Sequence, residues 1–385
     1  MSLPILGIES SCDETAAAVV RGGREILSSV VASQDDVHRK YGGVVPELAS
    51  REHLRRIVPV VREALERAGL EFAGLAAIGA TRGPGLIGSL LVGYTYGETL
   101  ARALAKPFIP VNHLEGHVHA VFLEAQQQAA AAGQLPAGLP ELPAVCLIVS
   151  GGHTVLYEVC SAHGSPDPPA EFPAYHCSYS RIGGTRDDAA GEAYDKVAKL
   201  LSLGYPGGPV IDQLAPRGNP ESVRFTAPHT RGNPLDFSFS GIKTAVLRHI
   251  RAHPQLAPEI AARTEALAQG VRRASELLPL CSPATLDLVA SFQRAVVSDL
   301  VTRTLAAAEE RAAKCVLVSG GVAANSELRT AFERQCRSRA LPAYFPSRAL
   351  STDNAAMIAA AAYPRLLAGD VAANGLGAEA NLPLA

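Results

Sequence analysis

The sequence predicts an α/β protein of two lobes, each a mixed β-sheet flanked by helices. First, its 385 residues exceed the size at which a single hydrophobic core stops growing, about 250–300 residues. Second, short apolar runs that end in polar or glycine-rich turns alternate with longer stretches of helical periodicity. Third, the second half of the chain repeats the plan of the first, with buried strands that lead into glycine pairs.

The composition is that of a globular protein with reduced thiols. Hydrophobic residues make up 48% and charged residues 19%, which excludes a disordered chain. A net charge of -2 supplies no field that steers nucleic acid toward the whole molecule. The 7 cysteines are scattered and form no CxxC pair, which favours free thiols. Because no leader peptide and no membrane span is recognisable, we expect a cytoplasmic protein that does not enter a membrane.

Strands and helices alternate in the first half. In order, we expect strands at 5–8, 16–20 and 25–31, a helix over 46–69, a strand at 76–81, a helix over 86–104 and a strand at 106–111. Apolar residues recur at helical spacing through the first of these helices, and Gly69 ends it. Residues 124–143 are rich in Ala and Gln and then in Pro, which predicts an exposed connection between the lobes with a frayed helical start.

Two similar segments in the second half predict strands that end in Ser-Gly-Gly. They are CLIVSGGHT at 146–154 and CVLVSGGVA at 315–323. Glycine lets an anion approach the backbone N–H groups closely, so the pair indicates a phosphate site. Ordinary strand-to-turn junctions remain the alternative. We also expect strands at 144–149, 153–159 and 314–319, and a last helix over 355–367.

His113 and His117 are candidate metal ligands. Four residues apart, they lie on one face of a helix for which Asn112 is the expected N-cap. The order is not that of an HExxH zinc peptidase, because Glu115 lies between the two histidines. Two surface histidines are the alternative. Asp353 is one candidate third ligand, although an N-cap role explains it as well, and such a set suits iron, zinc or manganese.

Three carboxylates share one predicted helical face. Asp188, Glu192 and Asp195 fall at positions i, i+4 and i+7. The face indicates a site for hydroxyls, amines or a cation, and a solvated surface is the alternative.

Nine ordered motifs resemble those of one family, the bacterial tRNA N6-adenosine threonylcarbamoyltransferases, once described as O-sialoglycoprotein endopeptidases. They are ESSCDETAAAVV, KYGGVVPELASREH, TRGPGLIGSLLVG, VNHLEGH, VSGGHT, DDAAGEAYDKVAKL with YPGGP, FSFSGIKTAV, SGGVAANSELR and STDNAAMIA. The resemblance extends from about residue 5 to residue 368. It implies a two-lobed actin/Hsp70/sugar-kinase-like fold, with lobe I over 1–123 and 354–385, a connection over 124–143 and lobe II over 144–353.

The implied activity is metal-dependent acyl transfer in tRNA modification. A threonylcarbamoyl group moves from threonylcarbamoyl-AMP to the N6 amine of the adenosine 3′ to the anticodon, in tRNAs that read codons beginning with adenine. By the resemblance, His113, His117 and Asp353 hold one divalent metal ion per subunit, iron or alternatively zinc. The residues implied to bind threonylcarbamoyl-AMP are Ile148, Val149, Ser150, Gly151, Gly152, Asp195, Gly208, Asp212 and Asn325. The implied partners are tRNA and two small proteins, an inactive paralogue (TsaB) and an ATPase (TsaE).

Asp13 and Glu14 occupy the turn that corresponds to the first phosphate segment of this fold. A carboxylate there cannot attract phosphate, so we expect it to position an amine or a water, with Glu14 as the candidate general base. Two rival functions remain open. A metalloendopeptidase needs a glutamate base beside a metal ligand, whereas a kinase or ATPase of the same fold needs a phosphoryl acceptor site and no histidine pair.

Overall fold

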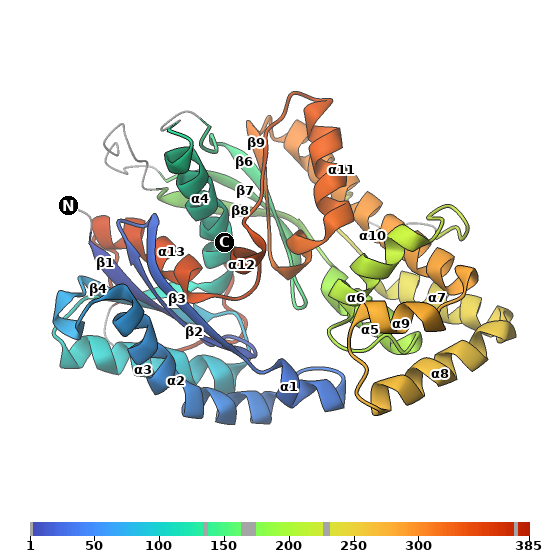
Figure 1. The fold of residues 1–385 in the computed structure, drawn as a ribbon. Helices are drawn as coiled ribbons and strands as arrows, with labels where there is room; N and C mark the ends of the chain where they lie inside the picture. Colours follow the sequence, from blue (N-terminus) through green and yellow to red (C-terminus); the bar gives the residue numbers. More distant parts are fainter. Residues whose placement is uncertain (1–2, 134–137, 163–174, 226–231, 373–375) are drawn as a thin grey trace.

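Two five-stranded β-sheets lie next to each other with helices around them (Figure 1). The computed structural model describes residues 3–133, 138–162, 175–225, 232–372 and 376–385. The first sheet has the order β3-β2-β1-β4-β5. Its strands are β1 (Pro4–Glu9), β2 (Glu14–Arg21), β3 (Glu25–Ser33), β4 (Ala77–Gly83) and β5 (Phe108–Asn112). The second has the order β10-β9-β6-β7-β8. Its strands are β6 (Ala144–Val149), β7 (Thr154–Ser161), β8 (Cys177–Gly184), β9 (Cys315–Ser319) and β10 (Ala343–Tyr344).

The two sheets share one topology. In the first, β1 pairs antiparallel with β2 and parallel with β4, and β2 continues antiparallel to β3. In the second, β6 pairs antiparallel with β7 and parallel with β9, and β7 continues antiparallel to β8. Each sheet is therefore an antiparallel meander extended by parallel strands. The predicted α/β fold class, with two similar halves, is confirmed.

Helices cover both sheets. Those of the first half are α1 (Asp35–His38), α2 (Pro46–Ala68), α3 (Ile87–Ala103) and α4 (His113–Ala131). The later helices are α5 (Ala190–Leu200), α6 (Gly207–Leu214), α7 (Ser240–Ala252), α8 (Ala257–Ala268), α9 (Ala274–Leu277), α10 (Pro283–Glu310), α11 (Ser326–Arg337), α12 (Arg348–Ser351) and α13 (Ala355–Leu367). Short 3-10 turns include η3 (Ala215–Arg217) and η6 (Gly321–Ala324). None of the described helices is both long and apolar enough to cross a bilayer.

Helix α4 is shared by the two sheets. Its Ala120 and Leu123 pack with α13 and the first sheet. Its Leu114, Val118 and Phe122 pack with strands of the second sheet. Because apolar residues occur around the helix and not on one stripe, it is buried between the two layers. The residues at its start are thus held from both sides.

The connection predicted over 124–143 begins with a helix, as expected, but one face of this helix is buried and not exposed. Helix α4 continues to Ala131, and Ala125, Gln126 and Ala129 on this extension are buried. Ala125 and Ala129 form a small core with Leu139. Alanine is the best helix former, so an Ala-rich segment extends a helix readily when one face can be buried. Residues 134–137 lie outside the described part of the chain. The division into lobes at 124–143 and 353 stays a prediction.

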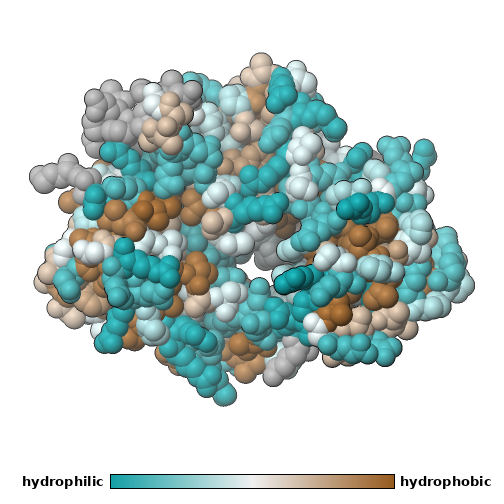
Figure 2. All heavy atoms as spheres, in the orientation of Figure 1, coloured by the Kyte–Doolittle hydropathy of each residue, from teal (hydrophilic) through white to brown (hydrophobic). Residues whose placement is uncertain are grey.

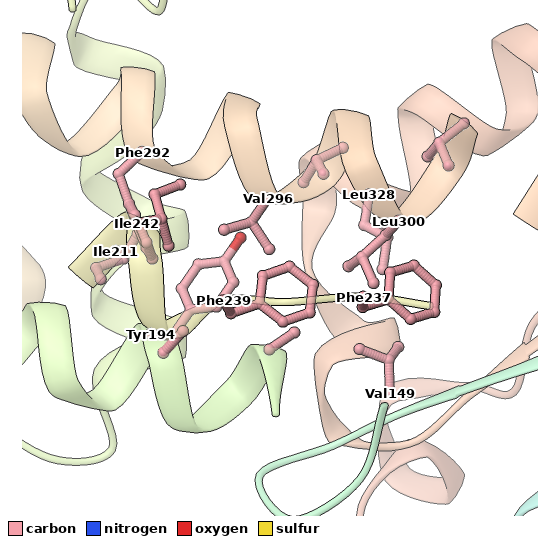
Figure 3. Packing of buried hydrophobic residues seen from close by; sticks show 14 of the residues in the cluster. Val149, Tyr194, Ile211, Phe237, Phe239, Ile242, Phe292, Val296, Leu300 and Leu328 are labelled. Carbon is pink, nitrogen blue, oxygen red and sulfur yellow. The ribbon is translucent and has the colours of Figure 1, made fainter. Parts of the chain in front are cut away.

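The second half has a large core beneath β6, β7 and β9. Figure 3 shows Phe237 and Phe239 side by side in this core, below Val296 and Leu300 of α10. Their rings are stacked with centroids 6.0 Å apart, and both side chains are buried. The alternating Phe-Ser-Phe-Ser segment therefore directs its aromatic residues inward.

Candidate functional site

His113 and His117 occupy the first two turns of α4. Asn112 caps the helix, since its Oδ1 accepts a hydrogen bond from the Leu114 N–H at 2.9 Å, as predicted. The imidazole centroids lie 4.7 Å apart, which is the neighbour relation expected at i and i+4. Both side chains are buried, so the two rings are not the solvated surface pair of the alternative.

Asp353 joins the two histidines from the far end of the sequence. Its Oδ1 lies 3.6 Å from His113 Nε2 and 3.3 Å from His117 Nε2. The candidate ligand atoms of the three residues lie within 4.8 Å of one another. A tetrahedral ion with ligands at about 2.0–2.1 Å separates its ligand atoms by roughly 3.3 Å, so one ion fits between them. Asn354, and not Asp353, caps α13 by accepting from the Met357 N–H at 3.0 Å.

The buried polar atoms of His117 fit a metal ligand. His117 is 0% exposed, and neither ring nitrogen makes a hydrogen bond within the described residues. An unsatisfied buried polar atom is costly, and a metal ion at Nε2 would supply the missing partner. Two imidazoles and a carboxylate are a donor set found with iron, zinc or manganese.

The charges of the three residues depend on one another. Burial alone would raise the pKa of Asp353, but the imidazoles of His113, His117 and His153 hold it well below its usual range. Burial lowers the pKa of His113, yet the carboxylates of Asp353 and Glu9 outweigh it and raise the value to about 9. The cluster is therefore a concentrated negative site that attracts a cation, whether a proton or a metal ion.

Glu9 lies directly behind His113, and sequence reasoning missed it. This residue ends β1 and is 0% exposed. Its Oε2 lies 3.0 Å from His113 Nδ1 and accepts from Thr81 Oγ1 at 2.7 Å. The sequence did offer one signal, a charged residue at the carboxyl end of an otherwise apolar strand. Charged residues are rarely buried without a partner, so a glutamate at this position indicates a functional or paired carboxylate.

The turn from β6 to β7 brings the second half to the metal centre. The His153 ring lies 6.3 Å from that of His113, centroid to centroid. Its burial, with His113 and His117 nearby, lowers the pKa of His153 to about 4. Ser150 closes the turn, since its Oγ accepts from the His153 N–H at 3.1 Å. Figure 2 shows the molecular surface hollowed near its centre, between the two halves.

The predicted substrate residues at 148–152 divide into two groups. Ile148 and Val149 are 0% exposed and belong to the cores on the two faces of β6, so only their backbone can contact a ligand. Gly151 and Gly152 are exposed, and a Cβ added to either would meet no atom within 4 Å. Gly321, after β9, is equally open. The glycine turns therefore leave room for a ligand beside the backbone.

Asp195 and Gly208 lie together at the start of α6. Asp195 Oδ1 accepts from the Gly207 N–H at 2.7 Å, and a Cβ at Gly208 would meet open space. Burial, partly offset by the amides of Gly207 and Gly208, raises the pKa of Asp195 to about 6. The three carboxylates predicted to share one helical face therefore do not form one site, because Asp195 contacts the start of α6. Asp188 and Glu192 instead bind Lys196 Nζ at 2.6 and 2.9 Å, so these two form a surface ion-pair cluster.

Asp212 and Asn325 meet between α6 and α11. The Ser326 N–H and Oγ both donate to the Asp212 carboxylate, at 3.1 and 2.7 Å. Asn325 caps α11 through Oδ1 and donates from Nδ2 to Gln293 Oε1 at 2.8 Å. Gln293 Nε2 in turn donates to Asp212 at 3.4 Å. One hydrogen-bonded group therefore holds both residues on the second half of the molecule.

Asp13 and Glu14 follow Glu9 in the turn that leads into β2. Burial, reinforced by the charges of Asp13, Asp353 and Asp35, raises the pKa of Glu14 well above its usual value. The Glu14 carboxylate therefore binds a proton more strongly than a solvated carboxylate does. His53 supports this turn, because its Nε2 lies 3.0 Å from the Cys12 carbonyl oxygen.

Two residues of α4 lie apart from the centre. Glu115 forms an ion pair with Arg365 Nη1 at 3.2 Å, so it is no base beside the histidine pair. His119 packs edge-to-face on Phe122.

Comparisons with known proteins place these residues in a family context. The family model described as "TsaD: tRNA N6-adenosine threonylcarbamoyltransferase" matches residues 25–164 and 173–360. A protein of that name from Koribacter versatilis is 57% identical over 394 residues, covering 99% of this chain and 98% of that protein. Another, from Symbiobacterium thermophilum, is 49% identical over 359 residues, covering 93% of this chain and 90% of that protein.

Solved structures show the same fold at low identity. A structure of full-length HypF in the phosphate- and nucleotide-bound form superposes with a TM-score of 0.52 and 12% identity, covering 94% of this chain and 56% of that chain. HypF from T. kodakarensis gives a TM-score of 0.52 and 15% identity, covering 96% of this chain and 48% of that chain. At these identities the likeness concerns the fold alone, and it confirms the predicted actin-like class.

Proposed function

Because the chain belongs to the family of tRNA N6-adenosine threonylcarbamoyltransferases, we propose that it modifies the adenosine 3′ to the anticodon of tRNA. The donor is threonylcarbamoyl-AMP, and the acceptor is the N6 amine of that adenosine in tRNAs that read codons beginning with adenine. One observation carries the proposal beyond the family name. The His113, His117 and Asp353 cluster lies beside the open glycine turn that follows β6.

We propose that the three clustered side chains hold one iron ion, with zinc as the alternative. Two histidines and one carboxylate are a set that iron(II) accepts while leaving positions for a substrate. When bound, the ion supplies a positive charge that polarises a carbonyl oxygen.

The protein's own residues position the donor. The backbone N–H groups of Gly151, Gly152 and Gly321 would hold the phosphate of the adenylate, because glycine permits close approach. The carboxylates of Asp195 and Asp212 would accept hydrogen bonds from ribose hydroxyls. Both already bind backbone N–H groups, so their orientation is set before a ligand arrives. Gly208 and Asn325 would complete the walls of this subsite.

The transfer step then needs one proton acceptor. The N6 nitrogen forms a bond to the carbamoyl carbon, the bond from that carbon to the phosphate oxygen breaks, and AMP leaves with the electron pair. The amine loses a proton, and we assign Glu14 as the acceptor, with Asp13 beside it. Burial raises the pKa of Glu14, and a carboxylate with a raised pKa binds a proton more strongly than a solvated one. Most of the rate gain would come from positioning and charge neutralisation.

The test is reconstitution with threonylcarbamoyl-AMP and tRNA, scored by the mass of the modified adenosine. We expect His113→Ala to lose bound metal and transfer together, because one of three ligands is gone. His119→Gln, a change on the same helix but away from the cluster, should keep both. Full transfer by a metal-free His113→Ala protein would refute the metal centre.

We also propose that an inactive paralogue docks on α2 and α3, with an ATPase joining the pair. Leu54 and Val58 of α2 are 67% and 39% exposed, and Ile87 and Leu91 of α3 are 48% and 49% exposed. Apolar side chains exposed together are typical of a protein interface. Leu54→Glu combined with Leu91→Glu should abolish co-elution with the paralogue and leave metal content unchanged. A cytoplasmic location completes the proposal, supported by seven cysteines that are all free thiols.

A further inference from the structure

We propose that Glu9 is a positioning residue for the metal centre, which fixes the proton of His113 on Nδ1 and so presents Nε2 to the ion. The inference rests on the metal centre of the proposed function and assigns a role to a residue outside the three ligands. It concerns how one ligand is oriented and made a better electron donor, not which residues touch the metal.

Glu9 is built into the fold as a hydrogen-bond acceptor. Donors reach it from three elements: the backbone N–H of Ser11 donates to Oε1, Thr81 Oγ1 of β4 donates to Oε2 at 2.7 Å, and His113 of α4 lies at 3.0 Å. The side chain is 0% exposed. A buried carboxylate is costly unless it is paired and hydrogen-bonded, and these contacts supply that compensation. Its position is therefore set by β1, β4 and α4 together.

The chemistry of the pair determines which nitrogen of His113 is free. An ionised carboxylate only accepts hydrogen bonds, so the facing Nδ1 must carry hydrogen. A neutral imidazole has a single N–H, and the lone pair therefore resides on Nε2. That atom is the one that faces Asp353 Oδ1, at 3.6 Å. A carboxylate behind a ligating histidine also increases the basicity of the ligand.

The two histidines differ in this respect. The Nδ1 atom of His117 has no hydrogen-bond partner among the described residues, so no acceptor fixes the hydrogen on that side of its ring. His113 has Glu9 at 3.0 Å and Ser11 Oγ at 3.2 Å from the same nitrogen. We therefore expect His113 to be the ligand with the defined orientation, and Glu9 to be the residue on which this depends.

A merely structural role for Glu9 predicts lost stability without a specific change in metal binding. Glu115 provides the matched control, because it is a second buried carboxylate, two residues from His113 on α4, whose partner is Arg365 and not a histidine. Glu115→Gln therefore reports the general effect of neutralising a buried carboxylate next to the site.

The experiment titrates purified, metal-free full-length protein with Co²⁺ and follows its visible absorption. For Glu9→Gln we expect affinity to fall about 10–100-fold, the usual effect of removing such a partner, while Glu115→Gln stays within about twofold of wild type. In the metal-free protein above pH 9, where the His113 ring is neutral, ¹⁵N NMR should show hydrogen on Nδ1 in the wild type and a mixture of both arrangements in Glu9→Gln.

A second variant keeps the test decisive if Glu9→Gln does not fold. Thr81→Val removes one donor to Glu9 with little change of volume, and should weaken Co²⁺ binding about two- to tenfold. If Glu9→Gln folds and binds Co²⁺ as tightly as wild type, the role of Glu9 is overturned. If only Thr81→Val folds, wild-type Co²⁺ affinity in that variant overturns it. Wild-type protein that binds no Co²⁺ would overturn the metal centre as well, so the two failures are distinguishable.

Discussion

Gly320 and Gly321, which follow β9, allow protein stability and ligand binding to be tested separately. A glycine-to-alanine substitution, which adds one methyl group, should affect stability at Gly320 and ligand binding at Gly321. Gly320 has φ 95° and ψ 165°, a backbone region that is essentially restricted to glycine. A Cβ added there would lie 2.4 Å from the Val149 carbonyl oxygen. Gly321, one residue later, has no positive φ, and an added Cβ would meet nothing within 4 Å.

The cost of Gly320→Ala follows from these two features. The backbone conformation costs about 1–3 kcal/mol for a residue with a side chain. The overlap with the backbone of β6 costs about 1–3 kcal/mol more, because a strand within a sheet cannot shift cheaply. We therefore expect a loss of about 2–6 kcal/mol in the free energy of unfolding of the second half. At roughly 2–4 °C per kcal/mol, Tm should fall by at least about 4 °C.

Thermal unfolding followed by circular dichroism measures this loss, with Gly321→Ala as the matched control. The control should melt within about 1 °C of wild type, since a surface methyl group changes stability by less than about 0.5 kcal/mol. It should nevertheless bind threonylcarbamoyl-AMP more weakly, because the methyl group occupies the space proposed for the adenylate phosphate. A Gly320→Ala protein that melts with wild type would refute the packing argument.

Three further predictions concern the site. The pKa of Asp195 is raised to about 6, so its carboxyl group ionises as the pH rises through that value. Because the ionised form accepts hydrogen bonds from the ribose hydroxyls, KM for threonylcarbamoyl-AMP should fall between about pH 5 and pH 7. The Asp195→Asn variant should lack this pH dependence. Deleting residues 376–385 removes the carbonyls of Leu382 and Pro383 that accept from Asn112 Nδ2, together with the contacts of Glu379 and Ala380 to β4 and the turn after it. A loss of at least about 1–3 kcal/mol and weaker Co²⁺ binding should appear in urea unfolding and metal titration, and unchanged values would contradict this. Metal at about 100 times its Kd should stabilise the protein by about 2.7 kcal/mol, and differential scanning calorimetry should show no such gain for His113→Ala.

Much of the fold was predictable because its signals are local. The strand expected at 144–149 is β6, and the helix expected at 355–367 is α13. Buried strands are short apolar runs, and amphipathic helices repeat with their own period, so neither depends on distant residues. The long helix α10 was not predicted; its apolar residues lie all around it, which weakens the periodic signal.

The site was predictable only in part. The spacing of His113 and His117 indicates a shared face, but periodicity could not distinguish a metal ligand from an N-cap at Asp353. The resemblance to a family supplied that carboxylate. The structure then showed that the neighbouring Asn354 makes the cap. Glu9 had no local signal beyond its charge, since its partners come from β4 and α4.

By itself, the sequence determined two similar halves, their strand and helix order, the glycine pairs that end two strands and one helical face with two imidazoles. The tertiary structure alone decided that α4 lies between both sheets, that Asp353 reaches its histidines, and that Glu9 lies behind one of them. The physical reason is the distance along the chain over which each kind of interaction acts. Backbone preferences and apolar periodicity act over a few residues, whereas a buried charged cluster forms only where packing brings distant strand and helix ends together.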